Sequence, residues 1–466
     1  MTNLDPTRRT SVTPVTVHNS DEDAPARTHR ADLLAAGAVV ALVLAAIAGT
    51  LWWNDGRQLG PGSFGGAPAD FGEWPLLGFF HPHIGPGTVP AVLLAVAVVV
   101  LGPGLAERLP WRAALAAAYG TAVAWTMALA LVDGWRFGFT KRLTGGTEYL
   151  HEVPGITDVG VMLRTFADRI VDFQPDSWTT HVSGHPPGAT LVFVWLDRIG
   201  LGGGTAASVV CVLAGAAAVV AVPVTLAALG HRDTARAALP FLVLFPGAVW
   251  VGVSADALFM GVTATGVALL AVGATRGRVL PCVAAGVLLG FGIFLSYGLV
   301  LMGAVALAVI VVTRNWRALG SAVAGALAVT GAFAAAGFWW FDGYGNVVIR
   351  YYQGIAADRP FEFWVWANLA CLALATGPVV GPGLRRAALA WRRVPGLVAV
   401  VAGAAVAVAA ADLSGMSKAE VERIWLPFAI WLVAAAALVP VRARRWWLLA
   451  QAATALAVNH LMLTNW

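Results

Sequence analysis

The chain has 466 residues, of which 59% are hydrophobic and 12% are charged, and its mean hydropathy is +0.75. These values exclude a soluble globular domain and are typical of a polytopic membrane protein. The net charge of +5 does not indicate a nucleic-acid partner, because the arginines lie in short clusters between apolar runs and form no single basic face. The cysteines lie inside apolar runs without CxxC spacing, so we expect neither a disulfide framework nor a zinc site: Cys211, Cys282 and Cys371.

Residues 1–31 form a polar segment of mixed charge that is rich in Pro and Thr. Such a segment buries too little apolar surface to fold, so we expect a disordered cytoplasmic N-terminus. The apolar run 33–53 is long enough to cross a bilayer and carries no cleavage site of the signal-peptide type. It is therefore expected to remain as the first transmembrane helix.

Apolar runs of about 17 to 25 residues recur along the whole chain, and each is long enough to cross a bilayer once. The sequence thus predicts an all-α protein with about thirteen transmembrane helices. The predicted segments are 33–53, 89–106, 113–132, 204–229, 237–252, 256–274, 279–295, 296–313, 318–337, 362–380, 395–411, 424–440 and 446–463.

Arginines fall on every second loop between these segments, and the positive-inside rule places such short loops in the cytoplasm. The Ala-, Gly-, Val- and Arg-rich composition is typical of a bacterium with GC-rich DNA, so we expect a bacterial plasma membrane. The basic loops after the N-terminus carry Arg108 and Arg112, Arg232 and Arg236, Arg276 and Arg278, Arg314 and Arg317, Arg385, Arg386, Arg392 and Arg393, and Arg442, Arg444 and Arg445.

This alternation holds only if residues 189–200 do not cross the membrane, so they are predicted to form a helix that lies at the outer surface. The pair 279–295 and 296–313 is separated by almost no polar turn. Two spans keep the arginines inside, while a re-entrant break or one long bent helix stays an alternative.

The outer loops are long and rich in ionisable residues, which tend to mark functional sites at a membrane edge: 54–88, 133–203, 338–361 and 412–423. Within the second loop, Val159, Leu163, Phe166, Ile170 and Phe173 recur at helical spacing. This pattern predicts an amphipathic interfacial helix over 157–173, with Thr157 or Asp158 as its N-cap.

Asp133 directly follows the apolar run 113–132, so it lies where a helix emerges on the outer face. A partly desolvated carboxylate in that place can act as a general base. The alternative is an ordinary helix-end aspartate in contact with water.

The stretch "GGTEYLHEVPG" groups Glu148, His151 and Glu152 within one or two helical turns. Carboxylate and imidazole groups could orient a sugar hydroxyl or bind a divalent cation such as Mg²⁺ or Mn²⁺. The spacing matches no defined metal motif, so a surface cluster stays the competing interpretation.

The stretch "SGHPPGATLVFVW" places His185 and two prolines in front of an apolar run. Pro186 and Pro187 suit an extended entry followed by the first turn of a helix. Gly188 lets backbone or ligand come close. A structural helix start explains the prolines but not the histidine.

Further ionisable residues lie at the outer ends of predicted spans. Arginine there is suited to bind a lipid-linked phosphate, although juxtamembrane arginine and tyrosine more often serve as headgroup anchors. The candidate binding residues from these positions are Asp256, Arg350, Tyr351, Glu422 and Arg423.

The order of these elements resembles the GT-C superfamily of integral membrane glycosyltransferases, which includes protein O-mannosyltransferases and aminoarabinose transferases. The resemblance rests on an acidic residue at the end of a span (Asp133), an amphipathic outer segment, "HPPGATLVFVWLDRIG", "SADALFMGVTATGVALLA" and "KAEVERIWLPF". It covers about residues 113–440, which we expect to form the GT-C-like module, preceded by two helices in 32–112 and followed by a last helix in 441–466. Three departures from the family pattern are Gly134 after the acidic residue, Gly188 after the prolines, and the two spans that precede the module.

The resemblance implies that Asp133 is the base that deprotonates an acceptor hydroxyl for inverting attack on the anomeric carbon. It implies a polyprenyl-phosphate sugar as donor, with a glycan, lipid or protein acceptor on the extracytoplasmic face. Arg423 or Arg350 would stabilise the leaving phosphate, His185 would contact the donor, and Glu148 and Glu152 would orient the acceptor or a metal. The competing hypothesis is a transporter or lipid flippase, although transporters usually place polar groups near the bilayer midplane.

Overall fold

The computed structural model describes residues 26–53, 75–76 and 78–464. The described part is helical apart from turns and one antiparallel ribbon, in which β1 (Gly78–Phe80) pairs with β2 (Met462–Thr464) and Phe79 lies opposite Leu463. The all-α prediction is therefore confirmed. Of the predicted disordered segment 1–31, residues 1–25 lie outside the described part, while residues 26–31 belong to the first turns of α1 (Ala26–Trp53).

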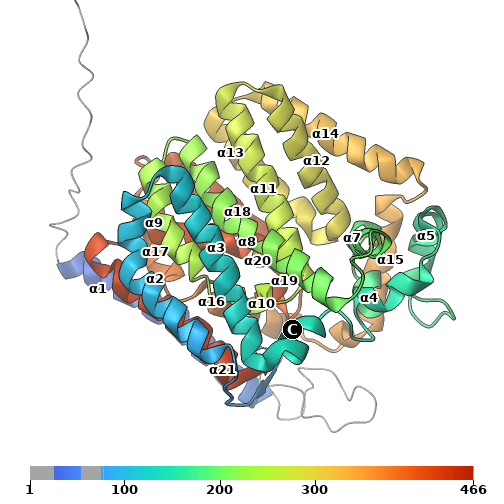
Figure 1. Ribbon diagram of the computed structural model, residues 1–466, viewed down its shortest axis with the longest axis horizontal. Coiled ribbons are helices and arrows are strands. Elements are labelled where there is room, and N and C mark those ends of the chain that lie inside the picture. Colours follow the sequence, from blue (N-terminus) through green and yellow to red (C-terminus); the bar gives the residue numbers. More distant parts are fainter. Residues whose placement is uncertain (1–25, 54–74, 77, 465–466) are drawn as a thin grey trace, which may run out of the picture.

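The helices follow one another along the chain as in Figure 1: α1 (Ala26–Trp53), α2 (Thr88–Arg108), α3 (Trp111–Ala130), α4 (Tyr149–Glu152), α5 (Val159–Thr165), α6 (Thr180–Ser183), α7 (Pro187–Arg198), α8 (Gly204–Ala228), α9 (Arg232–Val243), α10 (Ala248–Val251), α11 (Ala255–Arg276), α12 (Val279–Leu295), α13 (Met302–Thr313), α14 (Trp316–Ala335), α15 (Trp340–Gln353), α16 (Phe361–Thr376), α17 (Val380–Leu389), α18 (Pro395–Leu413), α19 (Val421–Ile424), α20 (Leu426–Val433) and α21 (Arg444–Leu461). Short 3-10 or π-helical turns join several of them, namely Leu131–Asp133, Gly134–Thr140, Val153–Gly155, Ala167–Arg169, Tyr297–Leu301, Ile355–Ala357, Ala434–Leu438 and Val441–Ala443.

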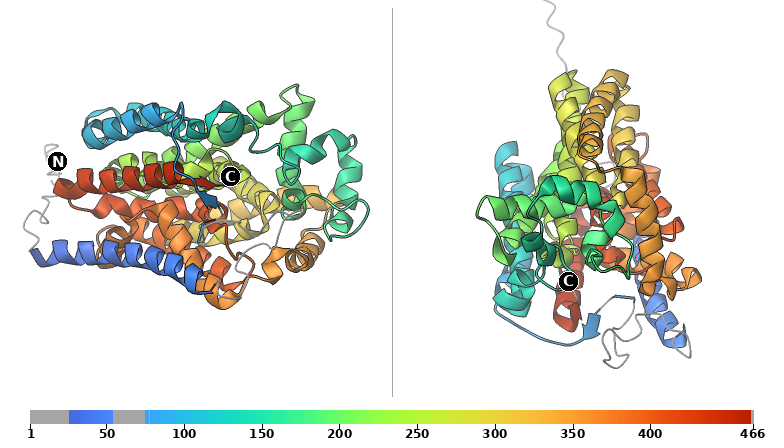
Figure 2. Two further views of the ribbon diagram at one scale, coloured as in Figure 1. Left: turned by 90° about the horizontal axis from the view of Figure 1, so that it is seen from below. Right: turned by 90° about the vertical axis from the view of Figure 1, so that its right-hand side faces the viewer.

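Seven helices of the described part are long and apolar enough to cross a membrane, or up to nine if each of two bent helix pairs counts as one span. The bent pairs are Phe361–Thr376 with Val380–Leu389, at 96°, and Leu426–Leu438 with Val441–Leu461, at 117°. The predicted number of thirteen spans is therefore not confirmed. In the left view of Figure 2 the long helices run roughly parallel, and short segments between α3 and α8 gather at one end.

The predicted span 237–252 is wrong as a continuous helix. α9 ends at Val243, a turn containing Pro246 follows, and α10 has only four residues. Proline lacks the N–H that would continue the helical hydrogen bonds, which explains the break.

The segment after the two prolines is too short to cross a membrane, as predicted. α7 has 12 residues, which corresponds to about 18 Å of helix against a hydrocarbon core of about 30 Å.

The region 279–313 forms two helices, because α12 ends at Leu295 and the next helical turn begins at Tyr297.

The predicted amphipathic helix over 157–173 is only partly correct. Asp158 caps α5 by accepting a hydrogen bond from the Val161 N–H over 3.0 Å. The helix ends at Thr165 and continues as a 3-10 turn, and Phe173 is 81% exposed with a positive φ of 66°. The other apolar residues of the predicted face are buried or half-buried: Val159, Leu163, Phe166 and Ile170.

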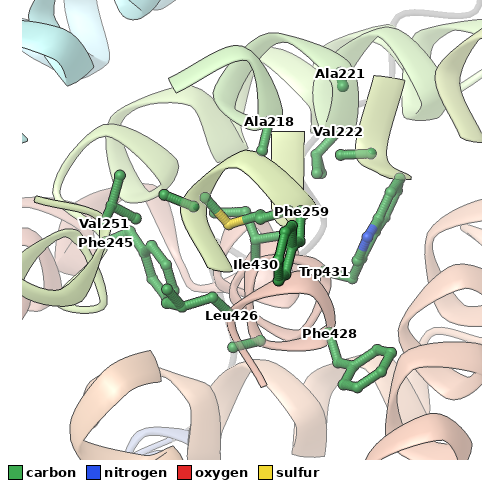
Figure 3. Close-up of a cluster of buried hydrophobic side chains, with 14 of the residues drawn as sticks. Ala218, Ala221, Val222, Phe245, Val251, Phe259, Leu426, Phe428, Ile430 and Trp431 are labelled. Carbon is green, nitrogen blue, oxygen red and sulfur yellow. The ribbon is translucent and has the colours of Figure 1, made fainter. Parts of the chain in front are cut away.

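The core lies between α8, α11 and α20, where aromatic and aliphatic side chains interdigitate (Figure 3). α8 and α11 approach closely because Gly261 has no side chain: a Cβ there would lie 1.8 Å from the carbonyl oxygen of Ala214. Small residues at such contacts are typical of helix packing in membranes. This contact fixes the start of α11, which carries Asp256.

The arginine-rich loops meet one another. Arg236 donates to the carbonyl oxygen of Leu109 over 3.0 Å, and Arg444 pairs with Glu107 at 3.2 Å. Asp32 in α1 pairs with Arg385 and Arg386, and the Gly396 N–H donates to His231. Loops that the arginine pattern assigned to one side are therefore in mutual contact.

Candidate active site

Asp133, the predicted base, is bonded through both carboxylate oxygens. Its Oδ1 lies 2.7 Å from Nε2 of His83, and its Oδ2 accepts a hydrogen bond from Nη2 of Arg142 over 2.6 Å. The side chains of all three are 12–15% exposed. Asp133 is thus a half-buried carboxylate that is held by two donors.

The chain just after α3 brings Arg142 back to Asp133. Residues Gly134–Thr140 form a π-helical turn that doubles back against the end of α3. Gly138 permits this fold, since a Cβ there would lie 1.8 Å from the carbonyl oxygen of Ala130. Arg142 then also donates to the carbonyl oxygen of Thr464 over 2.9 Å, which ties the turn to β2.

His83 reaches Asp133 from the segment before α2. The backbone N–H of His83 donates to the carbonyl oxygen of His460 over 2.9 Å, which continues the contact between β1 and β2. Gly85 and Gly87 let this segment lie on the end of α3, because Cβ atoms there would each lie 1.9 Å from backbone oxygens of Val132 and Ala128.

A second cluster surrounds Arg423, which is buried with a 7% exposed fraction. Its Nη1 donates to Oδ2 of Asp256 over 2.7 Å, and its Nη2 donates to Oε2 of Glu420 over 3.1 Å. Burial alone would lower the pKa of Arg423, but the charges of Asp256, Glu420 and Glu148 outweigh it and raise that pKa. The guanidinium is therefore held firmly in its charged form.

The Arg423 cluster continues toward α15 through a chain of contacts. Arg359 pairs with Oε1 of Glu420 at 3.2 Å and donates to the carbonyl oxygen of Lys418 over 2.6 Å. Nζ of Lys418 donates to the carbonyl oxygen of Arg359, and the backbone N–H of Lys418 donates to the hydroxyl of Tyr351 over 2.9 Å. Burial raises the pKa of Tyr351 to about 12, so this hydroxyl keeps its proton.

The same cluster continues in the other direction to the outer loop. Nη2 of Arg423 lies 3.4 Å from Nε2 of His181, and Nδ1 of His181 lies 2.9 Å from Oε1 of Glu148. A guanidinium only donates, so Nε2 of His181 is the acceptor in this contact. Glu148, Asp256, Tyr351 and Arg423, which the sequence selected separately, are thus linked through one network.

His185 lies next to this network. Its Nδ1 is 2.9 Å from the carbonyl oxygen of His181 and 2.8 Å from the hydroxyl of Tyr149. Burial lowers the pKa of His185 from 6.5 to about 4, although the charge of Asp256 acts in the opposite direction. The ring is therefore neutral at pH 7, with the proton on Nδ1 facing a carbonyl and the lone pair on Nε2.

The helix that His185 precedes begins as predicted. Pro186 is extended with ψ 161° and Pro187 is the first residue of α7. Gly188 is required by packing, because a Cβ there would lie 2.5 Å from the carbonyl oxygen of Phe294 in α12. The glycine that departs from the family pattern therefore sets the distance between α7 and α12.

Glu422 is buried beside Arg423, with a 1% exposed fraction. Neither of its carboxylate oxygens has a hydrogen-bond partner among the described residues, although the Cys371 thiol is close enough to interact electrostatically. Burial, with a smaller contribution from the charge of Glu420, raises the pKa of Glu422 to about 7.

Three predicted binding residues do not join the network. His151 is exposed, and Glu152 accepts a hydrogen bond from the backbone N–H of Thr179 over 2.9 Å, which is a role in loop structure. Arg350 pairs with Asp172 of the outer loop and so connects α15 to that loop.

The sequence analysis did not select several residues that the structure places in these clusters: His83, Arg142, Tyr149, His181, Arg359, Lys418 and Glu420. The only signal for His83 was the run "HPHIGPG", in which two histidines precede closely spaced glycines. The described residues contain no group of three or more His, Cys, Asp or Glu placed to hold a metal ion.

No family model matches the chain, and no curated protein sequence matches it. Two solved structures of ArnT from Cupriavidus metallidurans match the chain. The structure bound to undecaprenyl phosphate has a TM-score of 0.44 and 17% identity, and the match covers 70% of this chain. The structure in the apo state has a TM-score of 0.38 and 20% identity, and the match covers 62% of this chain. The Archaeoglobus fulgidus oligosaccharyltransferase in complex with Zn and sulfate matches with TM-score 0.44, 13% identity and 73% of this chain covered. The chain spans 60%, 56% and 51% of the lengths of these chains.

Proposed function

We propose that the chain is an integral membrane glycosyltransferase that moves a hexose or pentose from a polyprenyl-phosphate donor to a glycan, lipid or protein acceptor. The observation that carries the proposal is the buried Arg423 network. It brings a fixed cation together with carboxylates and histidine from the outer loop, α11 and the segment before α20. Buried ionisable groups that are costly to hold near lipid mark a site for polar chemistry.

The leaving group in this reaction is a lipid phosphate, and its developing negative charge needs a cation in place. Arg423 is the candidate, with Lys418 and Arg359 beside it. His185, which is neutral, would accept a hydrogen bond from a sugar hydroxyl at Nε2 and would not bind the phosphate as a cation. Asp133 would take the proton of the attacking acceptor hydroxyl.

The position of buried charge argues against a transporter. Within the described residues, the buried charged side chains lie near helix ends or between helices: Asp32, Asp256, Arg359, Arg386, Asp412, Lys418, Glu422 and Arg423. Transporters usually place such groups at broken helices near the midplane. Asp32 and Arg386 pair with each other among the arginine-rich loops, and the remaining residues support a site at the opposite membrane face.

The proposed orientation places the arginine-rich loops in the bacterial cytoplasm and the Arg423 network on the extracytoplasmic face. The three cysteines are buried, so single added cysteines can report the sidedness. In intact cells, a membrane-impermeant maleimide should label Asp176→Cys but not Arg317→Cys, both of which are exposed positions. Labelling of Arg317→Cys alone would reverse the orientation.

The activity is tested with the purified full chain in liposomes that contain undecaprenyl-phosphoryl mannose, glucose, arabinofuranose or 4-amino-4-deoxyarabinose, mixed with envelope lipid and glycan as acceptors. The proposal predicts release of undecaprenyl phosphate together with labelled acceptor for at least one sugar. Movement of intact donor between leaflets without release would support the flippase alternative and contradict the proposal.

A further inference from the structure

The ring of His83 lies between two acceptor oxygen atoms, and each contact needs a hydrogen on the facing ring nitrogen or between the two atoms. Nε2 is 2.7 Å from Oδ1 of Asp133, and Nδ1 is 2.6 Å from the carbonyl oxygen of His81. A neutral imidazole carries one N–H, and a carbonyl oxygen can only accept. Nδ1 therefore carries one proton, and the short contact between Nε2 and Oδ1 needs a second.

The observed geometry therefore fits a His83–Asp133 pair that holds one extra proton, compared with a neutral histidine next to an ionised carboxylate. The proton lies either on Nε2, as imidazolium and carboxylate, or on Oδ1, as imidazole and carboxylic acid. Without it, two lone pairs would face each other at 2.7 Å. The contact therefore forms when the pair takes up a proton.

The other charged and titratable groups around the pair already have partners of their own or face solvent. Arg142 is a permanent donor to Asp133, and His460 bonds Thr88 and the carbonyl oxygen of Leu456. The rings of His81 and His460 lie 5.6 Å and 6.5 Å from that of His83, and His81 is exposed. His83 is therefore the neighbour that can share a proton with Asp133.

We propose that His83 and Asp133 act as one proton-holding unit, an inference that rests on the proposed glycosyltransferase function. The acceptor oxygen forms a bond to the anomeric carbon as the bond from that carbon to the phosphate oxygen breaks, and the lipid phosphate leaves with the bonding electrons. The acceptor proton passes to Asp133 and is then held on the line between Oδ1 and Nε2 of His83. Water removes it before the next turnover. His83 is a positioning residue that acts through Asp133.

Replacement of His83 by glutamine tests the unit, because glutamine can donate one hydrogen bond to Asp133 but cannot hold the proton. The pH profile of undecaprenyl phosphate release should lose the limb that the pair contributes, and the rate at neutral pH should fall at least about tenfold. His81→Gln is the matched control, since that ring is exposed and does not contact Asp133, and it should keep the wild-type profile. An unchanged profile in His83→Gln would overturn the inference.

A second measurement needs no activity. At a pH where the pair holds its proton, ¹⁵N NMR of histidine-labelled protein in liposomes should show one of the nine histidines whose Nε2 shares a proton with a carboxylate. The signal should vanish in His83→Gln and become a neutral imidazole in Asp133→Asn. If the NMR signal is present but no donor releases undecaprenyl phosphate, the inferred proton-holding pair is supported and the proposed function is contradicted. If undecaprenyl phosphate is released but the NMR signal is absent, the proposed function is supported and the inferred proton-holding pair is contradicted.

Discussion

Arg423 and Asp256, which are 167 residues apart in the sequence, are joined by a hydrogen bond of 2.7 Å. The two side chains are 8% and 4% exposed. The bond connects the start of α11 with the segment that precedes α20. A buried pair of this kind contributes little to stability as a whole, but removal of one partner is costly because the other charge is left without compensation.

Arg423→Gln should therefore lower the free energy of unfolding by about 3–5 kcal/mol. It leaves the buried carboxylate of Asp256 without its cation, while Glu420 keeps its contact with Arg359. The unfolding temperature in detergent, followed by tryptophan fluorescence, measures the effect.

The double variant Asp256→Asn with Arg423→Gln is the matched comparison, because it removes both charges. It should be more stable than Arg423→Gln alone. Equal stability of the single and double variants would mean that the pair carries no electrostatic coupling.

For the Arg423 network, the sequence analysis selected the kinds of side chain more successfully than it could predict their contacts. Asp256 and Arg423 were selected because ionisable residues at helix ends are costly and rarely accidental, and Glu148 because it lies in a cluster of carboxylate and imidazole groups; neither argument needs contacts. His83 and Arg142 could not be selected as partners of Asp133. Their positions depend on the β1–β2 ribbon and on a π-helical turn that Gly138 permits, and no periodic pattern encodes either.

The predicted number of thirteen membrane spans is not confirmed, for a related reason. Hydropathy identifies apolar segments, but residues 237–252 are apolar because they are buried inside the protein, and they are not long enough as helices to cross a bilayer. The bends of 96° and 117° in the two bent helix pairs occur at Gly377-Pro378 and at Pro440, where proline lacks the N–H that would continue the helical hydrogen bonds.

His185 should make the protein less stable at low pH. Its folded pKa is about 4 and its ordinary value is 6.5, so between these values the unfolded chain binds a proton that the folded chain does not. Stability is retained above pH 6.5 and falls as the pH drops toward 4, by up to about 3 kcal/mol at about 1.4 kcal/mol per pKa unit.

The unfolding temperatures of the wild type and of His185→Gln at pH 7.5 and pH 4.5 check this expectation. The difference between the two pH values should be smaller in the variant, because glutamine does not titrate. The same difference in both proteins would show that His185 is not held neutral by the fold.

Glu422 should act in the opposite direction. Its folded pKa is about 7 and its ordinary value is 4.5, so the folded chain holds a proton that the unfolded chain has lost. The contribution is complete below pH 4.5 and is lost as the pH rises through 7, by about 3 kcal/mol. Relative to Glu422→Gln, the wild type should therefore unfold at a lower temperature at pH 8.5 than at pH 5.5, and a pH-independent difference would contradict the shift.

Gly188→Ala should separate α7 from α12, because the added Cβ would lie 2.5 Å from the carbonyl oxygen of Phe294. Overpacking of this size costs about 1–3 kcal/mol. Gly345→Ala in α15 is the control, since nothing lies within 4 Å of a Cβ there, and it should be neutral or slightly stabilising. Unfolding temperatures compare the two, and a neutral Gly188→Ala would contradict the close contact.

The proposed function is tested most directly by the rate of undecaprenyl phosphate release in Asp133→Asn, measured in liposomes with a donor that the wild type uses. Asparagine keeps the size of the side chain but cannot take the acceptor proton. The proposal predicts a loss of at least 100-fold, in line with the about 10²–10⁴-fold that a general base contributes, while the unfolding temperature confirms a folded variant. Release at the wild-type rate would contradict the proposed reaction at Asp133.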